Sequence, residues 1–188
     1  MKTQIYFISL LFIAALTSCG SNISTSMSPP VIVAPVKMVD LGKGAMVFIE
    51  EIRDERGQSD LGHSPNGPIT SIGSVPSTIR QGLEDLFKKS GFSVTDSAPV
   101  VLQSSLQQWD VDITGRMSSV IVSNAKLTIQ VYDPANRLAY TGKYQGNAQI
   151  QQSSADDKIV KEAMSGSMNQ VLEQIAADKT LMKLLATF

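Results

Sequence analysis

Two long segments of alternating apolar and polar residues constrain the fold of this chain more than any other feature. Between Ile121 and Val131, and again between Leu138 and Ile150, every second residue is apolar or small. A period of two places successive side chains on opposite faces of a β-strand. The intervening "DPAN" at 133–136 is typical of a tight turn. We therefore predict two long antiparallel strands with one apolar and one hydrated face.

The segment before these strands contains a change of parity. The inward-facing apolar residues from Val100 to Leu106 share one parity, and those from Trp109 to Ile113 share the other. A period of two changes parity only where an extra residue is inserted. The sequence therefore predicts a third strand with a β-bulge near Gln107 and Gln108.

Helical periodicity marks two further segments. The first predicted helix begins at Pro76, with Ser74 as its N-cap, and Gly91 ends it. The second begins at Asp156 and Asp157, whose carboxylates lie at the positive end of the helix dipole. Apolar residues recur at helical spacing in both, at Ile79, Leu83, Leu86 and Phe87 in the first and at Val160, Met164, Met168, Val171 and Ile175 in the second.

The remaining segments are shorter. Ala45–Ile52 and Phe92–Val94 are typical of strands, and the Gly-, Pro- and Asn-rich run from Gly57 to Gly73 predicts a loop. Gly166 in the last helix indicates close packing on the sheet, or a kink. We predict a single α+β domain at residues 44–188, with a mostly antiparallel sheet of four to five strands and two helices packed on one face.

The amino-terminal segment is typical of an exported protein. After a short basic start, the twelve residues from Ile5 to Leu16 carry no charge. They suit a signal peptide and fall short of the roughly 20 residues that span a bilayer. Leu16, Thr17 and Ser18 precede the only cysteine, Cys19, and together they resemble the lipobox of bacterial lipoproteins. The alternative is a free or buried cysteine that follows a leader.

The lipobox resemblance implies a lipid anchor. In that class a signal peptide, here residues 1–18, is removed, and Cys19 receives a diacylglyceryl group and an acylated amino group. Two or more acyl chains hold a protein stably on a membrane. Because lipoproteins kept in the inner membrane often carry Asp where this chain has Gly20, the resemblance implies the outer membrane and a domain facing the periplasm. Residues 19–43 predict a flexible Ser/Pro-rich tether that reaches up to about 80 Å.

Charge and cysteine content bear on the class of protein. The full chain has a net charge of −1, and removal of residues 1–18 with Lys2 leaves −2. Such a near-neutral chain lacks the basic surface that nucleic-acid binding needs, so we predict no nucleic-acid partner. A second cysteine is missing, so no disulfide forms within the chain and the fold must depend on its core.

Candidate catalytic residues are few. His63 is the only histidine, whereas nucleophilic triads and most zinc sites combine histidine with partners. The carboxylates of "EEIRDER" at 50–56 could form a glycosidase pair. Glu51 and Glu55, however, share a strand face with Arg53, which favours charge pairing. We predict no catalytic residue, no metal and no cofactor.

Two other charged pairs have a structural interpretation. Asp110 and Asp112 share the hydrated face of a strand, so we predict solvated charges rather than a calcium site. Asp54 and Arg56 point to the same side of an extended segment. We predict that their ion pair organises the loop at 57–73; the alternative is a surface pair worth under about 1 kcal/mol.

Several short motifs resemble the YajG family of bacterial lipoproteins. They are the lipobox at Cys19, "GAMVFIEEIRDERG" at 44–57, Leu61-Gly62, and "LEDLFKKSGFSV" at 83–94. The resemblance extends along nearly the whole chain. It implies a periplasm-facing lipoprotein, and no reaction is assigned to that family.

The predicted function is a non-enzymatic adaptor or assembly component of the cell envelope. A lipid anchor with a tether raises the effective concentration of the domain at the membrane. Exposed sheet edges and the hydrated face of residues 122–149 are the predicted docking surfaces for protein partners, including further copies of the chain. One alternative is a subunit of a secretion or motility complex. Another is a cell-wall-active enzyme, favoured by converging carboxylates, or a lipid or ligand carrier, favoured by a large apolar pocket.

Overall fold

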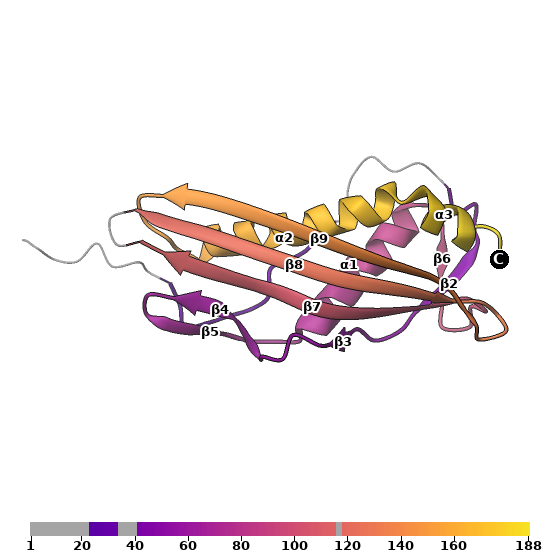
Figure 1. The fold of residues 1–188 in the computed structure, drawn as a ribbon, viewed down its shortest axis with the longest axis horizontal. Helices are drawn as coiled ribbons and strands as arrows, with labels where there is room; N and C mark the ends of the chain where they lie inside the picture. Colours follow the sequence, from indigo (N-terminus) through magenta and orange to yellow (C-terminus); the bar gives the residue numbers. More distant parts are fainter. Residues whose placement is uncertain (1–22, 34–40, 116–117) are drawn as a thin grey trace, which may run out of the picture.

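The domain is elongated, with helices covering one face of a long, twisted sheet (Figure 1). The computed structural model describes residues 23–33, 41–115 and 118–188. The predicted α+β class is confirmed, but the described residues form three helices rather than two. They are α1 (Val75–Lys89), α2 (Asp157–Ala177) and α3 (Lys179–Leu185).

Three long antiparallel strands form the largest part of the sheet, as their alternating sequence predicts. In β8 the residues from Ile121 to Val131 that were expected to face inward are all buried. The register between β7 and β8 shifts between Leu106 and Gln108, where the parity change places a bulge. The three strands are β7 (Val101–Thr114), β8 (Ser119–Tyr132) and β9 (Leu138–Gln152).

The sheet is larger and more mixed than the sequence predicts. Nine of its strands lie within the described residues, and the second edge of β7 pairs in parallel with three short strands in succession. Short strands carry no periodic signal, and parallel pairing joins segments far apart in the chain, so alternation alone does not reveal them. The short strands are β1 (Ser26–Met27), β2 (Met46–Ile49), β3 (Arg53–Asp54), β4 (Asp60–Ser64), β5 (Gly67–Ser71) and β6 (Ser93–Val94).

The segment from Gly57 to Gly73 is a β-hairpin, so the prediction of a loop is wrong. Its strands β4 and β5 pair with each other, and β4 also pairs with β7 through Gly62 and Val111. Gly62 has φ 142°, and a Cβ there would lie 1.8 Å from the carbonyl oxygen of Val111. The glycine, which in sequence indicates a loop, is needed here for close approach of two strands.

The helices begin and pack where the sequence places them. Ser74 caps α1 by accepting a hydrogen bond from the Ser77 amide, and Asp156 caps α2 in the same way. The predicted apolar stripes of both helices are fully buried. At Gly166 a Cβ would lie 3.2 Å from the Ala148 Cβ, so this glycine marks close packing between α2 and β9.

The core between the helices and the sheet is filled by side chains. Trp109 is fully buried, and its indole Nε1 donates to the carbonyl oxygen of Met164 at 3.0 Å. The hydroxyls of Ser123 and Ser167 lie 2.9 Å apart and join β8 to α2. The only tryptophan of the chain therefore packs in the core, with its polar group satisfied.

Residues 23–33 pack against the domain, although the sequence places them in a flexible tether. β1 pairs in parallel with β5, and Ile23, Met27 and Ile32 are 6%, 3% and 7% exposed. A Cβ on Gly82 of α1 would lie 3.2 Å from the side chain of Ile32, so that glycine makes room for the segment. Isolated apolar residues among serines and prolines show no strand or helix period, which is why the sequence did not indicate this packing.

Candidate functional site

The Asp54–Arg56 pair is a two-point ion pair with a buried arginine. Arg56 Nε donates to Asp54 Oδ1 at 2.9 Å, and Nη2 lies 2.8 Å from Oδ2. The side chain of Arg56 is 3% exposed and that of Asp54 is 32% exposed. The hydrogen bond from the guanidinium is the main cause that lowers the pKa of Asp54. This geometry is stronger than that of an ordinary surface pair.

Arg56 also contacts two other backbone segments. Its Nη1 lies 3.4 Å from the carbonyl oxygens of Asp60 and Trp109. One side chain thus connects the end of β3, the start of β4 and the middle of β7. These contacts support the predicted organising role for the segment at 57–73, and that role stays a prediction that the arginine variant below tests.

The other residues singled out in the sequence do not gather in one place. Leu16, Thr17, Ser18 and Cys19 lie outside the described residues. His63 is exposed on β4. Within residues 23–33, 41–115 and 118–188, no group of three or more His, Cys, Asp or Glu side chains is arranged to hold a metal ion.

Two other charged residues of the 50–56 segment, Arg53 and Glu55, hydrogen-bond to glutamines of β7. Arg53 donates to the side-chain oxygen of Gln103, and Glu55 accepts from Gln107, each at 3.3 Å. On the neighbouring segment of β7, Asp110 accepts from Gln108 at 2.9 Å. Each of these charged side chains therefore has a glutamine of β7 as its hydrogen-bond partner.

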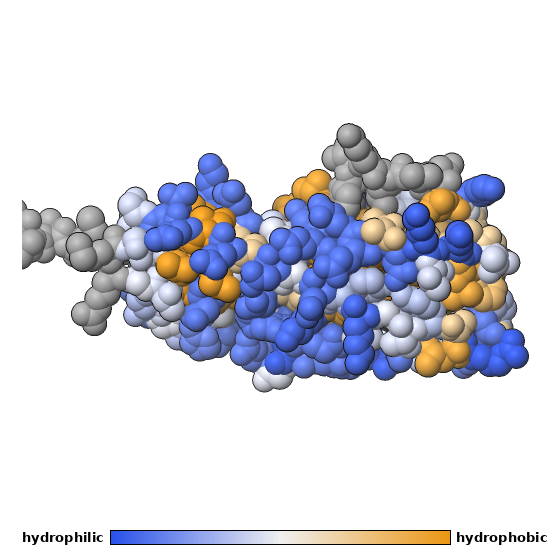
Figure 2. Space-filling model, turned by 45° about the horizontal axis from the view of Figure 1, so that its top comes forward, coloured by the Kyte–Doolittle hydropathy of each residue, from blue (hydrophilic) through white to orange (hydrophobic). Residues whose placement is uncertain are grey.

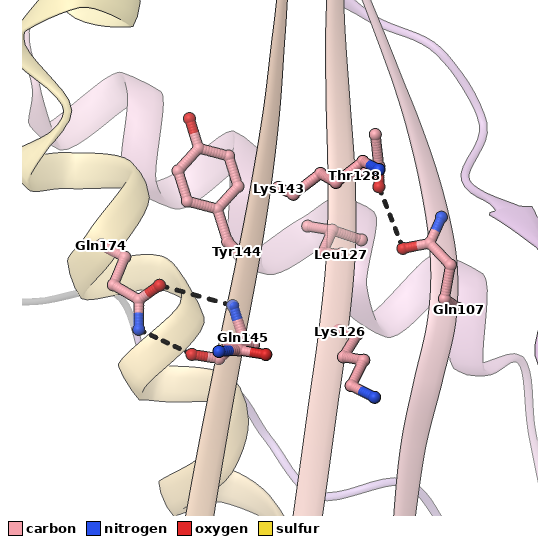
Figure 3. A pocket seen from close by; sticks show the side chains of 8 residues that line it. All are labelled: Gln107, Lys126, Leu127, Thr128, Lys143, Tyr144, Gln145 and Gln174. Carbon is pink, nitrogen blue, oxygen red and sulfur yellow. Dashed lines mark hydrogen bonds between the residues drawn. The ribbon is translucent and has the colours of Figure 1, made fainter.

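A shallow polar groove lies on the sheet face opposite the helices (Figure 3). It encloses about 550 Å³, and a smaller groove of about 330 Å³ adjoins it. The grooves are lined by three neighbouring strands and, at the edge of β9, by Gln170 and Gln174 of α2. The strand side chains on this face are mostly amides, hydroxyls and ammonium groups. We call them the polar strip: Gln107, Asn124, Lys126, Thr128, Lys143, Gln145 and Asn147.

Two lysines are the charged members of the polar strip. In the register of β8 and β9, Lys126 lies opposite Gln145 and Thr128 lies opposite Lys143, so the two lysines are diagonal neighbours. Both are exposed, and neither forms an ion pair with another residue that the structure describes. Gln107 accepts a hydrogen bond from the Thr128 hydroxyl at 3.1 Å, and this bond connects two of the side chains that line the groove. The strip therefore presents positive charge within a neutral, hydrogen-bonding surface.

Side chains from α2 cover part of the free edge of β9. Gln174 accepts from the Gln145 amide at 3.4 Å and donates to the Gln145 carbonyl at 2.6 Å, as a neighbouring strand would (Figure 3). Gln170 accepts from the Asn147 amide at 3.1 Å. Edge strands otherwise invite pairing with another chain. The sequence analysis did not find this protection, because it depends on how α2 lies beside β9.

Two tyrosines and a carboxylate join β9 to the junction of α2 and α3. The hydroxyls of Tyr140 and Tyr144 both donate to Asp178 Oδ2, and Asp178 Oδ1 caps α3. Burial, together with the Asp178 carboxylate, raises the pKa of both tyrosines. Burial opposes ionisation of Asp178, but hydrogen bonds from the tyrosines and the α3 amides outweigh it and lower its pKa. Gly142 lies beneath the pair, where a Cβ would collide with the Tyr144 hydroxyl.

The sequence matches the model of an uncharacterized lipoprotein family, the YajG-like family, over residues 39–186. The chain belongs to this family. The resemblance noted from short motifs is thereby confirmed, and the lipoprotein class implies anchoring in the cell envelope. No reaction is attached to the family. No curated protein matches the sequence.

Two solved structures share the fold of this YajG-like lipoprotein at low sequence identity, and a third is a weaker match. Protein XCC0632 from Xanthomonas campestris is 12% identical, with a TM-score of 0.63, and the match covers 87% of this chain and 99% of that one. Hypothetical protein CT253 from Chlamydia trachomatis is 7% identical, with a TM-score of 0.50 and coverage of 77% and 99%. Lipoprotein GNA1162 from Neisseria meningitidis is 11% identical, with a TM-score of 0.38 and coverage of 71% and 99%.

None of the helices in the described part of this YajG-like chain is long and apolar enough to cross a bilayer.

Proposed function

We propose that this lipoprotein is anchored to the outer membrane through a lipidated Cys19 and acts as a non-enzymatic envelope adaptor. The polar strip is its docking surface, and the partner is a protein with an acidic surface. The observation that carries the proposal is the pair of exposed lysines on adjacent strands, surrounded by amide and hydroxyl groups. Two like charges so close repel each other, and carboxylates on a partner would relieve that repulsion.

The chemistry of the strip supports docking more than catalysis. Amides and hydroxyls bind and orient a partner by hydrogen bonds, and they supply no group that titrates near neutral pH. Two of the four carboxylates at 50–56 that suggested a glycosidase are engaged, Asp54 by Arg56 and Glu55 by Gln107. A shallow strip across three hydrogen-bonded strands offers the extended surface that a protein partner needs.

The filled core supports an adaptor over a lipid or ligand carrier. Large side chains such as Trp109, Phe87 and Leu127 occupy the space between the helices and the sheet. A carrier would need a sizeable apolar cavity in that position. The predicted signal peptide at 1–18, the lipidated Cys19 and the domain at 44–188 form part of this proposal, and residues 23–33 are added to the domain because they pack against it. The periplasm-facing orientation and membership of a larger envelope complex belong to the proposal as well.

Site-specific photo-crosslinking in cells tests the docking surface. A photoreactive residue at Gln145, which leaves both lysines in place, should capture a defined partner protein, whereas the same residue at the exposed Lys183, on the short C-terminal helix, should not. Lys126→Glu should abolish capture from position 145, because the added negative charge repels an acidic partner. The side chains of Lys126, Gln145 and Lys183 are exposed, so we expect these variants to keep the fold. Equal capture from 145 and 183, or capture that survives Lys126→Glu, would refute the polar strip as the docking surface.

A further inference from the structure

The docked amino-terminal segment fixes where the chain joins the domain. The backbone amide and hydroxyl of Ser24 donate to the two carboxylate oxygens of Asp157, at 2.8 and 2.6 Å. Asp157 is the first residue of α2. Ile23, the first described residue, is buried beside these contacts. The chain therefore meets the domain at the start of α2.

Covalent geometry limits how far an anchor at Cys19 can lie from that point. Residues 20–22 alone separate Cys19 from Ile23. Four residue steps span at most about 14 Å. The 15 residues of β9 extend over about 50 Å, by comparison. An anchor at Cys19 can therefore hold only one end of the elongated domain against a bilayer while residues 23–33 stay docked.

That end is identified by topology. The start of α2, the ends of β7 and β9 and the tip of the β4–β5 hairpin lie at one end of the long axis (Figure 1). The strand registers agree, because His63 pairs with Asp112 near the end of β7 and Ser119 pairs with Gln152. We call this the proximal end; its exposed loop residues include Pro65, Asn66, Ser118, Ser153 and Ser154.

We propose that the proximal end lies against phospholipid headgroups and that the long strands stand away from the membrane. The inference rests on the lipid anchor of the proposed function and adds an orientation and a lipid-facing surface to it. Hydroxyl and amide side chains at this end can hydrogen-bond to headgroup phosphates and their water. Hydrophilic residues form most of the surface along the middle of the domain (Figure 2), which the proposed orientation places in water.

This orientation sets the height of the docking surface. Gln145, in the polar strip, is nine residues from Ser154, which corresponds to about 30 Å along β9. The acidic partner would therefore be met about 30 Å above the headgroups, rather than anywhere within the reach of an 80 Å tether. The far end, with the turn at 133–137 and α3, would point into the periplasm.

Fluorescence quenching in vesicles tests the orientation. The full-length lipidated protein would carry an environment-sensitive fluorophore on Ser154→Cys or, as the matched control at the far end, on Ala135→Cys; both residues lie in exposed loops. A lipidated Cys19 sulfur does not react with the label. In vesicles of phosphatidylethanolamine and phosphatidylglycerol that contain headgroup nitroxides, we expect at least threefold stronger quenching at position 154 than at position 135.

Flotation with the same vesicles separates the two proposals. The unlabelled protein should float with the vesicles, and Cys19→Ser should not. If the unmodified protein fails to float, the lipid anchor fails and the orientation fails with it. If it floats but positions 154 and 135 are quenched equally, or 135 more strongly, the orientation is refuted while the anchor stands.

Discussion

At the scale of single residues, Arg56 does more than its place in the sequence suggests. A charged residue two positions after Asp54 is easily interpreted as a surface partner, yet its side chain is buried and contacts three backbone segments. Buried charges persist where their hydrogen bonds are well satisfied. The carboxylate of Asp54 and two carbonyl oxygens provide those bonds here.

Replacing this arginine should loosen the β4–β5 hairpin. Arg56→Ala removes a two-point ion pair and two carbonyl contacts. We expect this to lower the free energy of unfolding by about 2 kcal/mol. Arg137→Ala is the matched control, because Arg137 also pairs with an aspartate but its side chain is 79% exposed. Urea denaturation and limited proteolysis of the segment at 57–73 give the readouts. Unchanged cleavage of that segment in Arg56→Ala would contradict the organising role.

The lowered carboxyl pKa values predict a loss of stability in acid. Asp54 and Asp178 have folded-state pKa values below the ordinary 3.8. Their stabilisation is therefore present above about pH 4 and is lost as the pH falls through the lowered values. Asp178→Asn keeps an oxygen acceptor for the tyrosines but removes the charge. Urea midpoints measured between pH 5 and pH 2 should fall less steeply in this variant than in the unmodified protein; identical slopes would argue against a contribution from Asp178.

At the scale of secondary-structure elements, glycines set how closely α2 lies on β9. A Cβ at Gly146 would lie 1.9 Å from the carbonyl oxygen of Ser167, which is backbone and cannot rotate away. The contact at Gly166, on the helix side, is milder at 3.2 Å and involves a methyl group. The same close approach lets Gln170 and Gln174 reach the edge of β9.

The two glycines should therefore respond differently to alanine. Gly146→Ala forces α2 away from β9 and should lower the free energy of unfolding by about 3 kcal/mol or more, because overpacking a close contact strains the fold. Gly166→Ala should be close to neutral, because a gain of up to about 1 kcal/mol in helix propensity offsets the tight contact. Thermal unfolding followed by circular dichroism measures both. A Gly146→Ala protein as stable as Gly166→Ala would show that α2 and β9 can separate at little cost.

At the scale of the whole molecule, the long strands and the two long helices were predictable from the sequence, and the short strands and long-range contacts that connect them were not. The three long strands, the bulge and the caps and apolar faces of the helices follow from periodic patterns of a dozen or more residues. The β4–β5 hairpin and the parallel strands along β7 were missed, since two to five residues hold too little pattern. For the candidate site, the hydrated face of residues 122–149 was foreseen, and the cover that Gln170 and Gln174 give to β9 was not.

The sequence by itself determined the lipoprotein family and the alternation that makes one sheet face apolar and the other polar. These depend on residues close together in the chain, whose side-chain order is itself the signal. Tertiary structure alone decided that Arg56 is buried, that Ile23 and Ile32 dock beside the helices, and that two lysines stand together in a groove. Each of these depends on contacts between residues far apart in sequence, and such contacts exist only once the helices and strands have packed.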